Sequence, residues 1–547
     1  MRPRAQSYPP LARLALCVAA LMLLACERPG RCRGDYCGTL VFVSTGQPDI
    51  LLPPLTQQSV GRDVHDQIFL KLADVGESLN TLGDRDFQPQ LADRWEWEDS
   101  LTLVFHLSPR ARWQDGPPVT ARDVAFTFAA YTDTALGAPA ADALRAIRAV
   151  TARDSLTAAF QFRRRYAEMF FDAVYHMRVL PAHLLAAVPR REWAKAAFGR
   201  APVGDGPYRF VSWRQGESLE LAADSTFFLG RPHIRRLIWR FTPDPQVALT
   251  QLLAGEADAW EFLGSPPNVE KARASATLVV YPYRGLGYGY LAFNLQRAPF
   301  TDRDVRRALF MAVDRERLRQ SVFGDLARVP PGPVPQAWPL WDSTLNAIPY
   351  DTARAAALLA SKGWRDNNGD GIRDRGGQKL AFHILTPVNS AVRRQYARLL
   401  QEQFRAIGVQ VELDEVENRV VQQTANAGNF DAVLTIWTTD PTPSGNLRDT
   451  WTRTGFGAGN FGRYESPAFD RALAASEIGG PGGALAAWKD GLRVLNGDAP
   501  GIWLFAPTNV AAVSKRIADV RIRPDSWWAL VRTWRIPETQ LIDRDRQ

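Results

Sequence analysis

The sequence predicts an α/β protein, and the order of its residue patterns is the main reason. Segments with the alternation of a strand are interleaved along the chain with segments that have the periodicity of a helix. The chain has 547 residues, of which 46% are hydrophobic and 17 are tryptophan, as is typical of a large folded protein. This length exceeds what one hydrophobic core serves, so we expect two or three domains.

In the N-terminal half, the clearest elements are a helix over 119–133 and a hairpin over 204–224. Thr120 is a good N-cap for the helix, and Asp123 places an acid in its first turn, where the helix dipole favours one. The hairpin turns at Arg214–Glu217. The other elements expected here are a strand within 38–55 that ends in a proline-rich loop, a strand at 101–107, and a helix over 165–180 that runs to Pro181.

The C-terminal half continues the alternation. A long helix is expected over 301–323 with Thr301 as its cap, and a helix over 350–364 that ends at Gly363. Strands are expected at 287–295 and 379–387, a helix and then a strand within 244–262, and again a helix and then a strand within 389–416. In "FDAVLTIWTTDPTPSG" (430–445) we expect a buried strand, with Val433, Leu434, Ile436 and Trp437 in a core and Asp440 at its end.

The N-terminus has the pattern of an export signal. Basic residues precede an apolar run over 14–24 that is the right size for a signal peptide and short for a membrane helix. The run ends in "LLAC" (23–26), which resembles the lipobox of bacterial lipoproteins, so we expect a signal peptide over 1–25 and a lipid on Cys26. The alternative is an ordinary signal peptide with a chance cysteine. The mature protein is then tethered to a membrane outside the cytoplasm, in the periplasm or at the cell surface.

The remaining cysteines and the net charge limit the protein's partners. Cys32 and Cys37 are close together in the expected tether (26–38), and an oxidising compartment permits a disulfide between them. Two cysteines alone are a poor zinc site. The net charge of +8 is spread among acidic residues with no long basic run, which argues against nucleic-acid binding.

Sequence patterns of common enzymes are absent. We find no nucleophile elbow, no serine–lysine motif, no zinc-binding helix and no phosphate-binding P-loop, and "GAGNFG" (457–462) has no preceding strand, so we interpret it as a loop. The histidines have no ligand spacing and are expected to be structural: His65, His106, His176, His183, His233 and His383. No catalytic residue is therefore assigned, although a catalytic pair of carboxylates has no sequence signature.

One segment has the spacing of a calcium loop. "DNNGDGIRD" places Asp366, Asn368, Asp370 and Asp374 at the first, third, fifth and ninth positions of an EF-hand-like loop, with glycine at the sixth. The twelfth position is Gly377 and not the glutamate that completes such a site. A structural calcium ion and a polar turn without metal are the two interpretations. No other cofactor is expected.

Several motifs together resemble one family. The segment 91–128 has Leu91, Ala92 and Trp95, then a strand, and then Asp115-Gly116 followed by Pro118, Ala121, Asp123 and Val124. This pattern, "PVGDGPYRFVSW", the segments 291–318 and 350–374, and "NFGRYESPAFDRAL" are similar to extracellular solute-binding proteins of family 5, the oligopeptide and dipeptide receptors of ABC importers. Asp205 stands where the family usually has threonine. The resemblance runs from about Leu40 to about Pro537.

The resemblance implies a fold of the type II periplasmic-binding-protein kind. It has two α/β lobes and an extra domain, with a hinged cleft that closes on the ligand. The expected limits are 39–61, 201–285 and 508–540 for lobe I, 62–200 for the extra domain, and 286–507 for lobe II.

The resemblance also implies ligand-binding residues. In oligopeptide-binding members, a tryptophan, two residues and an aspartate occur where this chain has Trp437 to Asp440, and the aspartate receives the α-ammonium of the peptide. Trp437 is then expected to line the cleft, Thr438 to offer backbone groups, and the loop around Gln47 to form the opposite wall. Pro441 follows Asp440 at once, however, so Asp440 can instead align with a later Asp-Pro pair of the family and be a turn residue.

The expected function is therefore a receptor that captures a short peptide and delivers it to an ABC permease and its ATPase. The protein is expected to be a monomer without activity of its own. The alternatives are the same role for a metal chelate, an oligosaccharide or an opine-like solute, and an envelope enzyme or sensor that reuses the fold.

Overall fold

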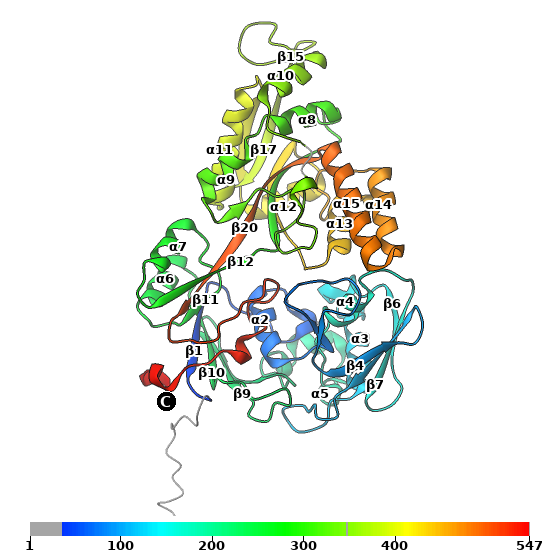
Figure 1. Ribbon diagram of the computed structural model, residues 1–547, viewed down its shortest axis with the longest axis vertical. Coiled ribbons are helices and arrows are strands. Elements are labelled where there is room, and N and C mark those ends of the chain that lie inside the picture. Colours follow the sequence, from blue (N-terminus) through cyan, green and yellow to red (C-terminus); the bar gives the residue numbers. More distant parts are fainter. Residues whose placement is uncertain (1–35, 346–347, 546–547) are drawn as a thin grey trace, which may run out of the picture.

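The computed structural model describes residues 36–345 and 348–545 and confirms the α/β class. The molecule is elongated, with two lobes one above the other (Figure 1). We call residues 36–285 and 508–545 the lower lobe and residues 286–507 the upper lobe. In the part of the chain that the structure describes, no helix is long and apolar enough to cross a membrane.

The lower lobe contains two sheets. The strands of its main sheet are β1 (Thr39–Ser44), β8 (Tyr208–Arg214), β9 (Ser218–Ala223), β10 (Arg236–Phe241), β11 (Ala259–Trp260) and β12 (Leu278–Arg284). A separate four-stranded sheet has the order β4-β5-β7-β6, with β4 (Ala92–Trp97), β5 (Thr102–Leu107), β6 (Ile147–Ala152) and β7 (Thr157–Phe162). A small ladder joins β2 (Ala73–Val75) and β3 (Phe87–Pro89).

Both sheets of the lower lobe share one hydrophobic core. It joins Phe42 and Trp239 of the main sheet to Phe105 and Phe160 of the second sheet, all of them buried. The helices around it are α2 (Ser59–Ile68), α3 (Ala121–Tyr131), α4 (Met169–Val174) and α5 (Ala182–Leu185). A smaller core lies under α6 (Pro245–Leu253) and α7 (Pro266–Arg273) on the other face of β1. The proposed limits of an extra domain, 62 and 200, stay a prediction.

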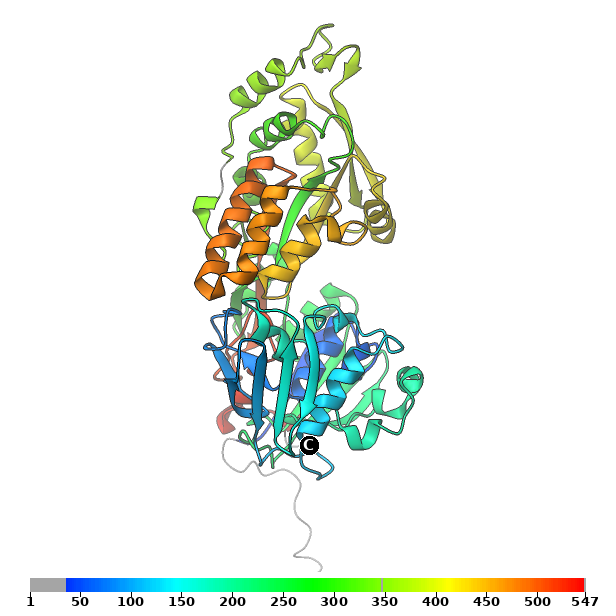
Figure 2. The same ribbon diagram turned by 90° about the vertical axis from the view of Figure 1, so that its right-hand side faces the viewer.

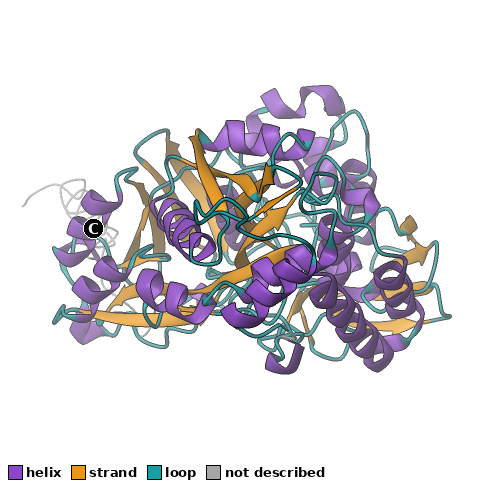
Figure 3. Ribbon diagram, turned by 90° about the horizontal axis from the view of Figure 1, so that it is seen from above, coloured by secondary structure: helices purple, strands orange, loops and turns teal. Residues whose placement is uncertain are grey.

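The upper lobe is built around β13 (Gly287–Phe293) and β19 (Ala432–Thr438), which pair antiparallel. The remaining strands are β14 (Ala327–Arg328), β15 (Asp374–Arg375), β16 (Gln378–Lys379), β17 (Ala381–Pro387) and β18 (Gln410–Val416). The helices are α8 (Arg303–Met311), α9 (Arg315–Phe323), α10 (Thr352–Ser361), α11 (Ala391–Arg405), α12 (Asn418–Ala427), α13 (Pro443–Trp451), α14 (Pro467–Ile478) and α15 (Gly480–Asp498). They pack around the strands with a core of their own (Figure 3).

The lobes are joined at two neighbouring places. One is the short link from β12 to β13, and the other is the long strand β20 (Gly501–Ser514), which pairs with β13 above and with β11 and β12 below. Through β20, one sheet continues across both lobes with twelve strands in the described residues. Away from this hinge, α14 and α15 stand over the four-stranded sheet of the lower lobe (Figure 2).

Most predicted caps and turns are confirmed. Thr120 and Asp123 form a capping box at the start of α3, with the Asp123 carboxylate accepting from the Thr120 N–H at 2.8 Å. The hairpin β8–β9 turns at Gly216, which has a positive φ of 73°. Gly363 follows α10 with φ 82°, a conformation that favours glycine.

Two helix predictions were wrong in their limits. Residues 301–323 form two helices because Asp314 caps a second one, its carboxylate accepting from the N–H of Arg317 at 3.0 Å, and Asp302 rather than Thr301 caps the first. Residues 165–180 are helical only in α4. The chain beyond α4 is held by tertiary bonds instead, since the N–H of Val179 donates to the carbonyl of Leu70 at 3.0 Å.

The ends of the described chain meet at a buried charge cluster that we call the Arg516 clasp. The Arg516 guanidinium donates to Asp258 at 2.6 Å, to Asp545 at 2.8 Å and to the carbonyl of Thr39 at 2.6 Å. The same carboxylates accept the backbone N–H groups of Thr39 and Val41 on β1. One arginine therefore ties β1, the segment after β20 and the C-terminal turn together.

The predicted disulfide cannot be followed in full. Cys37 is buried beside the carbonyl of Ile536, at 4.0 Å from its Sγ. Cys32 lies outside the described residues, as do Cys26 and the whole predicted signal peptide. The disulfide and the lipid attachment stay predictions.

Candidate functional site

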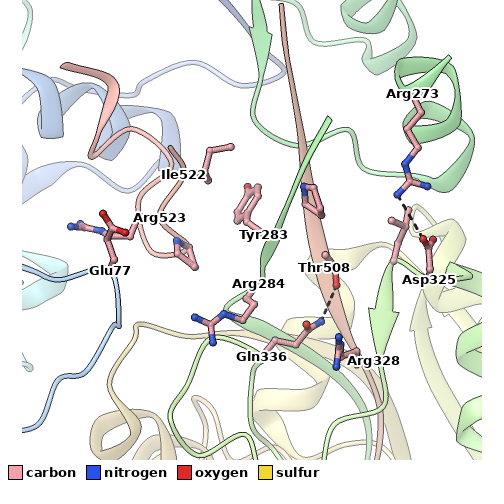
Figure 4. Close-up of a pocket in the computed structure, with 13 residues that line it drawn as sticks. Glu77, Arg273, Tyr283, Arg284, Asp325, Arg328, Gln336, Thr508, Ile522 and Arg523 are labelled. Carbon is pink, nitrogen blue, oxygen red and sulfur yellow. Dashed lines mark hydrogen bonds and ion pairs between the residues drawn. The ribbon is translucent and has the colours of Figure 1, made fainter. Parts of the chain in front are cut away.

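A cleft at the hinge opens between the two lobes. It holds a pocket of about 540 Å³ with walls from both lobes and from β20 (Figure 4). The lower lobe contributes Tyr283 and Arg284 at the end of β12, and the upper lobe contributes Arg328 and Gln336. Gln336 is fixed to β20 by its side-chain N–H, which donates to the carbonyl of Ala506 at 2.7 Å. The cleft is thus shaped by the strands that join the lobes.

The charged side chains of this hinge pocket are either paired within the protein or unpaired. Arg273 pairs with Asp325 at 3.7 Å, and Glu77 pairs with Arg521. Arg523 is buried and held by Asp74 at 2.7 Å and Asp525 at 2.6 Å. Arg284 and Arg328 are exposed, and neither guanidinium has an ion pair or hydrogen bond to any residue in the described ranges. Their charges are available to an anionic group of a ligand.

The segment that carries Asp440 follows the prediction in part. β19 ends at Thr438, and its residues Val433 and Leu434 are fully buried as expected. Ile436, expected in the core, is 38% exposed, and Trp437 is half-buried. The strand leaves the core halfway along because β17 pairs with β19 only as far as Val433. The second half of β19 therefore extends beyond the strand that covers it.

Asp440 is exposed two residues after β19. The indole N–H of Trp338 donates to its backbone carbonyl at 2.9 Å, which fixes the loop. Its carboxylate has no hydrogen bond or ion pair with a residue of 36–345 or 348–545. A turn aspartate normally accepts a nearby backbone N–H, and this carboxylate does not.

The lower lobe presents an aromatic and charged surface toward Asp440. Burial and then the negative charge of Asp440 raise the pKa of the Tyr175 hydroxyl well above its usual value, so Asp440 lies within electrostatic reach of Tyr175. Lys71 lies over the Tyr175 ring, 4.5 Å from its centroid. Nearby, Arg178 binds Asp66 with its Nε at 3.0 Å, so that carboxylate is already paired. Asp440 thus extends from the upper lobe toward a lower-lobe surface whose own charges are matched.

Trp437 and Thr438 occupy the exposed half of β19. Trp437 packs near Phe461 with ring centroids 6.2 Å apart, and its buried indole N–H has no hydrogen-bond partner in the described part of the chain. Thr438 is exposed and pairs with Gly287 of β13. On the edge away from β13, no described strand pairs with Ile436, Trp437 or Thr438. That edge leaves backbone groups for a further extended chain.

Gln47 lies in the loop after β1, and its side chain is bound to the β8–β9 turn. Its side-chain oxygen accepts from the N–H of Gly216 in the β8–β9 turn at 2.8 Å. Its neighbours Thr45 and Gly46 line a second pocket, of about 450 Å³, in the lower lobe. The loop around Gln47 therefore borders a cavity, although the Gln47 side chain supports a turn.

The calcium-like loop uses its acids within itself. Asp366 accepts the backbone N–H groups of Gly369 at 2.8 Å and Gly371 at 3.0 Å, and Asp370 pairs with Lys379 at 2.7 Å. Within the described ranges, no group of three or more His, Cys, Asp or Glu residues is arranged to hold a metal ion. Calcium at Asp366, Asn368, Asp370 and Asp374 stays a prediction.

Several residues of the cleft were not predicted. Arg284 and Arg328 have no motif, since each is one arginine among many, and only the folding of β12 and β14 onto β20 brings them together. Asp63 and Glu261 line the second pocket and also went unnoticed. A signal existed for Glu261, because an acid between Trp260 and Phe262 is unusual at the end of a short buried strand.

Comparisons with known proteins agree with the architecture. The family "Bacterial extracellular solute-binding proteins, family 5 Middle" matches residues 86–458. The oligopeptide-binding protein AppA of Bacillus subtilis is 26% identical over 509 residues, covering 90% of this chain and 91% of AppA. The structure of AppA with a nonapeptide matches with a TM-score of 0.75 at 24% identity, over 92% of this chain and all of that one.

A second solved structure shows how widely the fold is used. NikZ of Campylobacter jejuni in complex with Ni(L-His) matches with a TM-score of 0.74 at 24% identity, over 92% of this chain and all of NikZ. The family match covers more than half of the chain and includes most of the motifs on which the resemblance was based, although "NFGRYESPAFDRAL" (460–473) follows its last residue. This chain belongs to the bacterial extracellular solute-binding proteins of family 5.

Proposed function

We propose that this protein is the receptor of an ABC importer and captures short peptides between its lobes, outside the cytoplasmic membrane. One observation carries the peptide assignment. The Asp440 carboxylate is exposed, held in place through its backbone, and without a partner among the described residues. An unpaired anion in a cleft suits the α-ammonium of a peptide, since the closing lobes exclude water and strengthen the attraction.

Two further features fit an extended peptide. The open edge of β19 at Trp437 and Thr438 offers main-chain hydrogen bonds, which give affinity without regard to side chains. The unpaired Arg284 and Arg328 in the hinge pocket suit a carboxylate at the other end of the ligand. Gln47 would support the lower wall through the β8–β9 turn. The relative AppA is named as an oligopeptide-binding protein, and its solved structure is a complex with a nonapeptide, which supports the same class of ligand.

A metal chelate is the second candidate, because two unpaired arginines in one pocket also suit the carboxylates of a chelating ligand. The NikZ complex shows such a solute on the same fold. Mass spectrometry of material released from the purified protein separates the two, since a chelate contains a metal and has no series of peptide masses.

Calorimetry with a peptide and its N-acetylated form tests the role of Asp440. Asp440→Asn and Asp440→Ala should each weaken binding of the free peptide by about 2–5 kcal/mol. Acetylation should weaken binding to the wild type far more than to either variant, because it removes the charge that Asp440 binds. Equal affinities in all combinations would assign Asp440 to the turn.

The remaining parts of the proposal concern the protein's surroundings. Cys26 would carry the lipid anchor, the receptor would act as a monomer, and a permease with its ATPase would receive the peptide. Cys26→Ala should leave the precursor unprocessed or release the protein from the membrane fraction. Normal processing and membrane retention of that variant would contradict the anchor.

A further inference from the structure

The second pocket of the lower lobe has an unusual lining. Asp63 on α2 and Glu261 after β11 both face a cavity of about 450 Å³. Trp239, Trp260 and Trp528 also line it, together with polar residues of the loop after β1 and of α2. All three tryptophans are at least 95% buried, so their rings are fixed in place. The cavity combines two acids with three aromatic surfaces.

These two acids are not neutralised within the protein. Neither Asp63 nor Glu261 forms an ion pair with any residue that the structure describes. Burial raises the pKa of both carboxyl groups, that of Glu261 to about 7, and the charge of Glu261 raises the pKa of Asp63 further. Each carboxyl group therefore disfavours the ionisation of the other, and the neighbouring cation Arg62, which lowers the pKa of Asp63, forms no ion pair with either in the described ranges.

Two indole N–H groups belong to tryptophans in the same wall. The indole N–H of Trp528 lies toward both carboxylates and lowers their pKa values, but it makes no hydrogen bond of normal geometry. The N–H of Trp239 is also buried without a partner among residues 36–345 and 348–545.

The pocket adjoins the hinge pocket, which belongs to the proposed peptide site. Tyr283 lines both this pocket and the hinge pocket that contains Arg284 and Arg328. Its hydroxyl donates to the carbonyl of Glu261 at 3.3 Å, which places Glu261 at the junction of the two cavities. Asp63 and Glu261 therefore lie in the cavity next to the hinge pocket.

We propose that Asp63, Glu261 and the tryptophans form a subsite for an organic cation, the ammonium or guanidinium of a lysine or arginine side chain of the captured peptide. This rests on the proposed function and adds a preference to it. Carboxylates give charge-assisted hydrogen bonds to such a group, and indole faces attract it further when water is excluded. The subsite makes the receptor selective for peptides with a basic residue at one position.

Two sets of probes test the proposal with the full-length protein. The first is tetra-alanine and the same peptide with lysine, arginine, norleucine or glutamate placed at each position in turn. The second is n-butylammonium and n-butylguanidinium against n-butanol, which detects the pocket without a peptide. The proteins are the wild type, the double variant Asp63→Asn with Glu261→Gln, and the control Glu270→Gln, which alters an exposed acid on α7.

The expected result is a preference at one position. Lysine or arginine there should bind the wild type and the control at least about tenfold more tightly than norleucine. The double variant should lose this preference but retain its affinity for tetra-alanine. The small cations should bind the wild type and not the double variant.

Other outcomes separate this inference from the proposed function. Peptide binding without any basic preference, and without binding of the small cations, would overturn the subsite and leave the peptide receptor intact. Binding of the small cations without binding of any peptide would overturn the peptide assignment and support the subsite. A third outcome concerns N-acetylation of the peptide. If acetylation weakens binding to the wild type and to Asp440→Asn but not to the double variant, this pocket holds the α-ammonium, and the side-chain assignment is overturned.

Discussion

The lower lobe contains two sets of acids in opposite surroundings, one buried and ion-paired and one half-buried without an ion pair among the described residues. In the Arg516 clasp, the side chains of Asp258 and Asp545 are 1% and 0% exposed, and both carboxylates bind the guanidinium of Arg516 and backbone N–H groups of β1. In the second pocket, Asp63 and Glu261 face a cavity and lie close to each other. The only indole N–H directed toward them, that of Trp528, makes no hydrogen bond of normal geometry in the described residues. Both sets of acids lie in the lower lobe.

The difference shows which acids serve the fold and which are left for a ligand. A buried charge without a partner lowers stability, so it persists only where something else requires it. The clasp acids are matched in the protein itself and need nothing from outside. The pocket acids and Asp440 are unmatched, and all three face cavities or the space between the lobes. We expect substitutions in the two groups to have opposite effects on stability and binding.

The largest effect should come from Arg516→Ala in the clasp. The change leaves Asp545 buried without its cation and Asp258 with Arg544 alone, and loss of one partner of a buried pair typically costs about 3–5 kcal/mol of folding stability. Because this cluster of charges ties β1 to the C-terminal turn, denaturant unfolding should begin earlier in the lower lobe. Chemical denaturation followed by tryptophan fluorescence measures the loss.

Arg521→Ala is the matched control, since Arg521 forms its ion pair with Glu77 on the surface. Exposed pairs contribute about 0–1 kcal/mol. Equal stability losses in the two variants would show that the clasp is no more than another surface pair. Peptide selectivity should be unchanged in both, because neither arginine reaches the second pocket.

A smaller effect is expected at Glu168, a buried acid that lies between the lobes. Its carboxylate accepts from Thr81 of the lower lobe at 3.3 Å and from Thr442, the N-cap of α13 in the upper lobe. Glu168→Ala should destabilise this arrangement of the lobes by about 1–2 kcal/mol, because two hydroxyl groups lose their acceptor. Ligand affinity should fall accordingly, by about 5- to 30-fold.

Glu168→Gln distinguishes the hydrogen bond from the charge. The amide oxygen still accepts from the threonines, so most of the affinity should return. Calorimetry gives the affinity, and small-angle scattering gives the radius of gyration with and without peptide. An affinity for Glu168→Ala equal to that of the wild type would mean that this contact has no part in closure.

The scaffold was more predictable than the site, and particular residues show why. The Thr120–Asp123 capping box and the turn at Gly216 depend on neighbours in sequence, so local chemistry determines them. The prediction of a helix over 165–180 was wrong beyond α4. There the backbone N–H of Val179 donates to the carbonyl of Leu70, which is distant in sequence, and not to a carbonyl of the preceding turn. Local periodicity carries no information about such a partner.

The site combines residues that are far apart in the chain. Asp440 was found because a short motif with Trp437 surrounds it. Asp63 and Glu261 come from separate elements, and their proximity depends on how α2 packs against the end of β11. Ile436 was misplaced because its exposure depends on where β17 stops pairing, which the alternation of residues does not reveal. Long-range packing therefore accounts for most of what the sequence did not predict.

The smallest expected effect is on the stability of the ligand-free protein. It tests most directly the difference between the ion-paired acids of the clasp and the unpaired acids of the second pocket. Removing a matched acid destabilises a protein, whereas removing an unmatched pair should stabilise it. Asp63→Asn with Glu261→Gln removes two repelling charges and should raise the free energy of unfolding near neutral pH by about 1–2 kcal/mol, after allowance for solvent in the pocket.

The pH dependence of this stability difference follows from the direction of the Glu261 pKa shift. The pKa of Glu261 is raised from 4.5 to about 7, so folding disfavours its charged form, and that penalty is complete above about 7 and absent below 4.5. Arg62, Asp66 and Tyr283 also face the pair and are unchanged in the variant. The difference in melting temperature between variant and wild type should therefore be largest in mildly alkaline buffer and shrink as the pH falls toward 4.5.

Cation binding should change in the opposite sense, weakening below about pH 7 as Glu261 takes up a proton. A double variant less stable than the wild type at every pH would place Asp63 and Glu261 with the clasp, among the acids that hold the fold.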